Sequence, residues 1–117
     1  MATLVDDITN ALSNGAREGA AAASGAGRDL GQDVETFVVP HLRDIAGEVA
    51  SIIEKRNDGI YTDITAKDLL ASEADAVKVL IETMTTLAVF EAEKIRDAII
   101  SALAGAVNAA VGFALLA

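Results

Sequence analysis

The last twenty residues, 98–117, contain no charged side chain, and this stretch constrains the fold more than any other part of the sequence. On a helical wheel both sides of this segment are apolar or small, so a helix here has no face that prefers water. Such a helix must be surrounded by protein or by lipid. The sequence therefore predicts a protein that is organised around its C-terminal helix.

Two strips of residues divide the surface of this predicted helix. The spacing of four between Ser101, Gly105 and Ala109 allows two helix backbones to approach closely. The small-residue strip consists of Ala98, Ser101, Ala102, Gly105, Ala109 and Gly112. The strip of branched side chains consists of Ile100, Leu103, Val107 and Val111, with Ile99 beside it. We predict that these residues, together with Asn108, form a self-association helix, so that the protein is a homo-oligomer.

Membrane insertion of 98–117 is the competing prediction, because twenty helical residues cover about 30 Å of hydrocarbon. The strongly apolar residues of this segment contribute about −2.4 to −4.8 kcal/mol to insertion. Asn108 lies in the middle of the segment, and burying an unpartnered amide costs roughly as much. The free energy of inserting this segment as a single transmembrane helix is therefore near zero. Membrane contact is expected only for an oligomer in which Asn108 bonds across helices.

The composition of the whole chain favours helices over sheet. Apolar residues make up 52% of the 117 residues but aromatic residues only 3%, and 24 residues are alanine. Strands concentrate branched and aromatic residues, whereas alanine is the best helix former. We therefore predict an all-α protein, either an elongated helical hairpin or a small bundle.

The C-terminal helix is predicted to be long, because no glycine or proline occurs between Ser72 and Gly105. It is predicted to begin at one of two capping boxes and to extend from about 66 or 73 to 115, which corresponds to roughly 65 to 75 Å. The boxes are Thr65 with Asp68 and Ser72 with Asp75. A compact globule of this length has a radius of gyration of roughly 13 Å. The helix must therefore break, or the protein must be elongated.

The N-terminal part, residues 1–28, is predicted to be a short amphipathic helix followed by a Gly/Ala-rich linker. Leu4, Ile8 and Leu12 repeat at the helical spacing over residues 3–13, and Thr3 can cap the first turn. Residues 14–28 contain several glycines, each of which costs about 1 kcal/mol in helix propensity, so we predict a hinge or weakly helical linker here. The alternative is a close-packed helix face of small residues.

Residues 29–117 are predicted to form a helical hairpin whose first arm covers 29–57. The apolar stripe of this arm passes Pro40 without losing its phase, so we predict a kinked helix or two helices that meet at Val39–Pro40. The end of the arm is marked by Lys55 and Arg56, which suit a last turn, and by Gly59, which suits a C-terminal cap.

Several classes of function are disfavoured by the sequence. A net charge of −9 repels nucleic-acid phosphates. The chain has no cysteine and a single histidine, His41, which we expect on the surface in a first turn. The loop 54–65 has Arg56 and Thr65 where a calcium loop needs carboxylates. We therefore expect the chain to bind no nucleic acid, metal, cofactor or small-molecule substrate. Glu91 lies close to the apolar stripe of its helix, and we expect its side chain at the edge of that stripe.

The first residues carry acid where a secretory signal would carry Lys or Arg, so no N-terminal signal peptide is expected. Together these features predict a non-enzymatic structural or assembly protein that self-associates through 98–117. The more specific prediction is a structural component of a phage or virus. The alternative is a soluble helical-bundle binding module whose C-terminal helix belongs to its own core.

Overall fold

The computed structural model describes residues 3–23, 30–84, 89–112 and 115. Within these residues the chain is all-helical, as the composition predicts. Its helices are α1 (Leu4–Ala23), α2 (Gly31–Phe37), α3 (Val39–Asn57), α4 (Asp63–Glu82) and α5 (Val89–Val111). The molecule measures 50 × 29 × 21 Å and has a radius of gyration of 14.4 Å.

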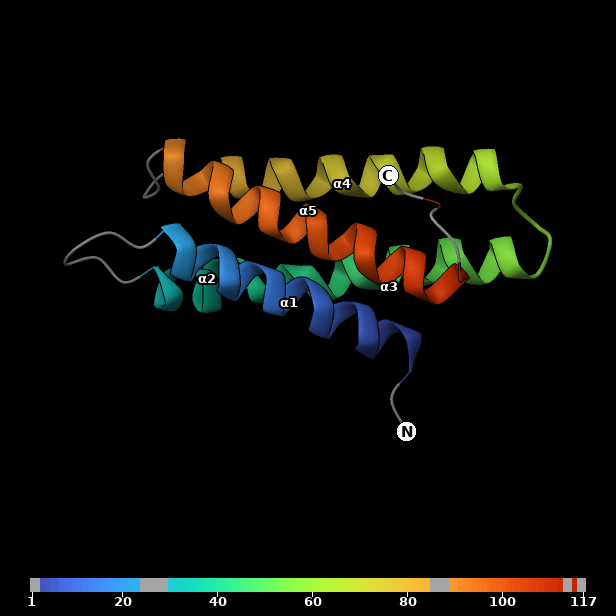
Figure 1. The fold of residues 1–117 in the computed structure, drawn as a ribbon, viewed down its shortest axis with the longest axis horizontal. Helices are drawn as coiled ribbons and strands as arrows, with labels where there is room; N and C mark the ends of the chain where they lie inside the picture. Colours follow the sequence, from blue (N-terminus) through green and yellow to red (C-terminus); the bar gives the residue numbers. More distant parts are fainter. Residues whose placement is uncertain (1–2, 24–29, 85–88, 113–114, 116–117) are drawn as a thin grey trace.

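The four long helices lie roughly along the long axis of the molecule (Figure 1). Helix α1 packs against α5 and α3, and α4 packs against α3 and α5. Helices α4 and α5 are antiparallel, and α1 and α5 are antiparallel as well (Figure 1). One continuous core fills the space between them, and its largest fully buried side chains include Ile8, Leu12, Leu42, Leu70, Ile95, Ile99 and Leu103.

The single C-terminal helix of 65 to 75 Å is not present, because α4 ends at Glu82 and α5 begins at Val89. The break contains neither glycine nor proline. Glu82 is instead followed by three threonines within four residues, and these β-branched residues are poor helix formers. The hydroxyl of Thr83 also donates a hydrogen bond to the carbonyl oxygen of Leu80, at 2.6 Å. The predicted helix therefore forms two antiparallel helices.

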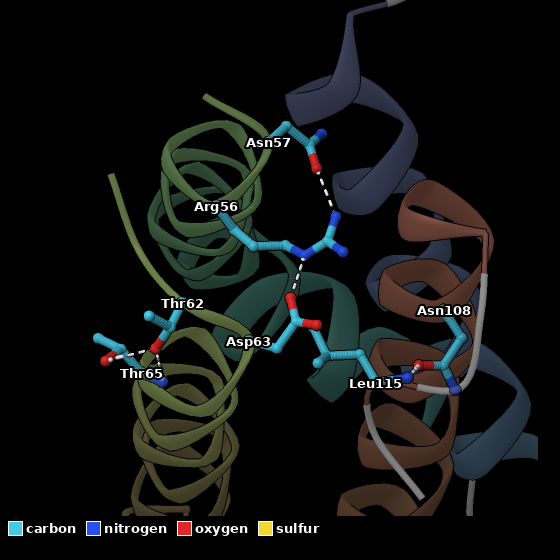
Figure 2. Close-up of polar contacts among 7 residues, drawn as sticks. All are labelled: Arg56, Asn57, Thr62, Asp63, Thr65, Asn108 and Leu115. Atoms are coloured by element: carbon cyan, nitrogen blue, oxygen red, sulfur yellow. Dashed lines mark hydrogen bonds and ion pairs between the residues drawn. The ribbon is translucent and has the colours of Figure 1, made fainter. Parts of the chain in front are cut away.

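Helix α4 begins earlier than either predicted capping box. Thr62 is its N-cap, and the hydroxyl oxygen of Thr62 accepts a hydrogen bond from the backbone N–H of Thr65 at 3.2 Å (Figure 2). Ser72 lies inside α4, where its hydroxyl donates to the carbonyl oxygen of Asp68 at 3.4 Å. The predicted boxes were wrong because Thr62 offers a side-chain cap sooner after the preceding turn.

Helix α1 continues to Ala23, so residues 14–23 are not the hinge or linker that was predicted. Residues 24–28 of that prediction lie outside the described residues. Gly15 and Gly19 are helical and buried, and their missing side chains let α1 approach α5 closely. This packing offsets their low helix propensity, and the alternative of a close-packed small-residue face is confirmed as far as Ala23.

The prediction of two helices that meet near Pro40 is confirmed. Helix α2 ends at Phe37, and α3 begins at Val39 with Pro40 in its first turn, where no donor is lost. His41 is exposed in that turn, as expected. At the other end, Lys55 and Arg56 lie in the last turn of α3.

Candidate interaction site

The branched side chains of the predicted self-association helix lie mostly in the core of the chain itself. Along α5, Ile95, Ile99, Leu103 and Val107 are each no more than 1% exposed, and they repeat every four residues. Ile100 and Val111 are half-buried and pack against the same core. The helices of this chain therefore cover the branched strip.

Two of the small residues of α5 are also used within the chain. We call the contact of Gly15 and Gly19 with Ala98 and Ala102 the α1–α5 seam. A Cβ atom added at Gly15 would lie 2.8 Å from the Cβ of Ala102 and 2.9 Å from the carbonyl oxygen of Ala98. At Gly19 it would lie 2.7 Å from the Cα of Ile95. The two backbones thus approach more closely than any side chain would allow.

The other residues of the predicted small-residue strip are not covered by the described part of the chain. Ser101, Gly105 and Ala109 of α5 and Gly112, directly after α5, are exposed, and we call them the α5 strip. A Cβ atom added at Gly105 would meet no atom within 4 Å. The strip therefore has open space above it, although it contains the same residue types as the α1–α5 seam.

A groove of about 320 Å³ lies beside the α5 strip, between the start of α1 and the end of α5. It is lined by Leu4, Asp7, Ile8, Ala11, Ala106, Ala109 and Ala110, and we call it the α1–α5 groove. Ala109 belongs to both the groove and the strip. Among these lining residues only Asp7 is charged, so strip and groove together form a nearly uncharged surface on an acidic chain.

Asn108 bonds within the chain. Its side-chain oxygen accepts a hydrogen bond from the backbone N–H of Leu115 at 2.9 Å (Figure 2). Gly112, at φ +84°, donates its N–H to the carbonyl oxygen of Asn108, also at 2.9 Å. The side chain of Leu115 is buried. The amide that was predicted to bond across helices therefore closes the end of α5.

A second groove, of about 300 Å³, lies between the end of α4 and the start of α5, and we call it the α4–α5 groove. Its lining combines apolar side chains with charges of both signs: Lys78, Ile81, Glu82, Met84, Val89, Ala92, Glu93 and Arg96. This groove was not predicted, because the absence of glycine and proline between Ser72 and Gly105 is typical of one continuous helix. The threonines after Glu82 were the signal that could have revealed it.

Two glutamates lie in positions that differ from an ordinary surface carboxylate. Glu91 is buried, at 7% exposed, and not at the helix edge, because it continues the four-residue spacing of Ile95 and Ile99. Partial burial raises the pKa of the Glu73 carboxyl, and the negative charge of Glu48 raises it further. Within the described residues, no buried side-chain nitrogen or oxygen atom lacks a hydrogen-bond partner.

The turn between α3 and α4 holds its polar side chains against one another. Arg56 donates to Asp63 at 2.7 Å and to the side-chain oxygen of Asn57 at 2.8 Å (Figure 2). In the part of the chain that the structure describes, no three His, Cys, Asp or Glu side chains gather as metal ligands would. The contacts of Arg56 thus make this loop a structural turn.

None of the helices, over the described residues, is both long and apolar enough to cross a membrane. Comparisons with family models, with curated proteins and with solved structures found no match.

Proposed function

We propose that this chain is a non-enzymatic structural or assembly protein that self-associates through the α5 strip and the α1–α5 groove. One observation carries the proposal. One side of α5 belongs to the core, yet Ser101, Gly105 and Ala109 on another side are left uncovered by the described part of the chain. Small residues at this spacing allow helices to pack backbone to backbone, as α1 and α5 already do within the chain.

Electrostatics support the same surface. Copies with a net charge of −9 repel one another over most of their area. The α5 strip has no charge, and the lining of the α1–α5 groove contributes only Asp7. Two copies can therefore meet here with little charge repulsion, and a two-fold axis would bring the same surface of each copy together.

The proposed contact is between protein surfaces and not between protein and lipid. Ile99, Leu103 and Val107 supply much of the strongly apolar area of 98–117, and the core of the chain already buries them. The more specific prediction of a phage or virus component stays a prediction.

A second candidate function is a binding module for a different protein. The burial of Ile95, Ile99 and Leu103 favours it, because a C-terminal helix that belongs to its own core needs no second copy for cover. In this case the chain alone is a monomer, and its exposed surfaces serve another partner.

Sedimentation velocity on the full chain, from about 10 µM to about 1 mM, tests the first proposal, since weak interfaces form in this range. We expect species heavier than the 12.0 kDa chain, with the heavier fraction growing with concentration. Gly105→Leu should weaken association at least about tenfold, because a leucine side chain prevents close approach of two helices.

Gly47→Leu is the matched control. Gly47 is also helical, and a Cβ atom there meets nothing within 4 Å, but it lies on α3 and belongs to neither the α5 strip nor the lining of the α1–α5 groove. A full chain that stays monomeric over the whole range would contradict self-association and leave the binding module. Truncation before 98 is not used, because it would remove Ile99 and Leu103 from the core.

A further inference from the structure

The two ends of the bundle expose large apolar side chains. At one end, around the turn between α3 and α4, Ile60 is 66% and Ile64 is 77% exposed. At the other end, Val89 in the α4–α5 groove is 76% exposed. Helix α4, which is about 30 Å long, separates these two sites along the long axis of the molecule (Figure 1).

The two ends differ in shape. Ile60 lies in the turn before α4 and Ile64 lies in the first turn of α4, and both side chains are exposed. The α4–α5 groove offers a recess of about 300 Å³ whose apolar lining comes from Ile81, Met84, Val89 and Ala92. The isoleucines could therefore be received by the groove of another copy.

Lys67, beside the isoleucines, is opposite in sign to two carboxylates that line the groove. Asp58, Asp63 and Asp68 also lie near the isoleucines, and Asp63 pairs with Arg56. Lys67 lies one turn after Ile64 and makes no ion pair with the residues that the structure describes. On the groove side, Lys78 and Arg96 already pair with Asp75 and Asp97, at 3.6 Å and 3.0 Å.

Glu82 and Glu93, which also line the groove, make no ion pair within the described part of the chain. A lysine that arrives one helical turn beside an apolar anchor would meet these two carboxylates. The groove lining as a whole balances two positive and two negative residues, so it does not share the acidic excess of the chain.

We propose that Ile60 and Ile64 of one copy dock into the α4–α5 groove of the next copy, with Lys67 beside Glu82 and Glu93. The contact joins two different surfaces, so each copy keeps one free end and the assembly grows as a linear chain. An end-on contact is smaller than the ~800 Å² per partner of a stable interface, so association is weak and concentration-dependent. This inference does not depend on the α5 strip.

The decisive experiment uses two variants at exposed positions, Ile64→Glu and Val89→Glu. Each alone should lose chain growth in sedimentation velocity while keeping the helical circular dichroism of the parent. When the two are mixed, Ile64→Glu supplies an intact groove and Val89→Glu supplies intact isoleucines. The mixture should therefore form a one-to-one dimer and nothing larger.

Val79→Glu is the matched control, because Val79 is exposed on α4 but belongs to neither docking surface. It should assemble like the parent. Lys67→Glu should weaken chain growth several-fold at low salt, and the difference from the parent should shrink as salt screens the charges. Parent protein that stays monomeric at about 1 mM, or a mixture of Ile64→Glu and Val89→Glu that stays monomeric, would overturn the proposal.

The mixture is prepared in the Gly105→Leu background, so that the surface of the proposed function does not contribute. A two-fold dimer through the α5 strip would survive Ile64→Glu and Val89→Glu but not Gly105→Leu. Head-to-tail chains would survive Gly105→Leu and be lost in the other two variants. The failure of one interface is thereby distinguished from the failure of the other.

Discussion

Glycines occupy covered positions in α1 and an open position in α5. A side chain at Gly15 or Gly19 would collide with α5, whereas one at Gly105 would meet nothing. Each glycine inside a helix costs about 1 kcal/mol relative to alanine. Close packing offsets that cost in α1, but nothing in the described part of the chain offsets it at Gly105. A small residue inside a helix is therefore explained by the chain that packs against it, and the open Gly105 is the reason to propose a second copy at the α5 strip.

The first test asks whether α5 belongs to the core, and it uses Leu103→Ala. Leu103 is 1% exposed, and Leu103→Ala should lower the free energy of unfolding by about 3 kcal/mol, because it leaves a cavity. Urea denaturation measures the change. Ile64→Ala is the exposed counterpart and should change stability by less than ~0.5 kcal/mol. Equal stability of the Leu103→Ala variant and the parent would contradict the covered position of α5.

The second test breaks the α1–α5 seam directly. Gly19→Leu should lower the free energy of unfolding by about 2 kcal/mol, because the added side chain meets the backbone of Ile95, which cannot move aside. In Gly47→Leu the same change should raise stability by roughly 0.5 to 1 kcal/mol through helix propensity. The seam would be refuted if both variants gained stability, as judged by the shift in the urea midpoint.

The third test concerns the closure of α5. Asn108→Ala removes the hydrogen bond to the backbone N–H of Leu115 and should lower the free energy of unfolding by about 1 kcal/mol. Hydrogen exchange at that N–H should become faster. Ser101→Ala, at an exposed position of the same helix, should do neither. An unchanged exchange rate at Leu115 would show that Asn108 does not hold this turn.

The fourth test uses the open glycine. Gly105→Ala should raise the free energy of unfolding of the monomer by up to about 1 kcal/mol, because it gains helix propensity without a clash. Thermal unfolding at a concentration below that of self-association gives the value. A loss of stability would mean that Gly105 is covered within its own chain after all.

The fifth test concerns the partly buried carboxylate of Glu73, and we expect its effect on stability to be the smallest. Burial and then Glu48 raise the pKa of Glu73, so the folded state favours the protonated form. Its stabilising contribution is complete below the ordinary pKa of glutamate and is lost as pH rises through the raised pKa. Glu73→Gln should therefore stabilise the protein at neutral pH, and the gain should disappear at about pH 4.

Urea denaturation at both pH values measures the effect of Glu73→Gln. A gain that persists at low pH would point to packing and not to charge as its cause.

Features of the fold that depend on local chemistry could be predicted from the sequence. Pro40 placed the junction of α2 and α3, because proline suits a first turn and disrupts a helix interior. Features that depend on a distant partner could not. Gly15 and Gly19 argue for a linker until α5 lies against them. The end of α4 was missed because three threonines weaken a helix less visibly than one proline.

The candidate site was predicted only as a set of residues. Ala98 and Ser101 look equivalent in the sequence, since both are small and lie on one strip. In the structure Ala98 contacts α1 and Ser101 is exposed. A helical wheel shows on which face of α5 each residue lies. The position of α1 decides which of these faces is covered.

The α1–α5 seam joins residues near the two ends of the sequence, which has a consequence for synthesis on the ribosome. Helix α1 emerges first, but its glycine face has no partner until α5 has been made. Contacts between distant residues carry a large loop-closure entropy and form slowly. Helix α1 can pack against α3 earlier, but its glycine face must stay uncovered until almost the whole protein has emerged.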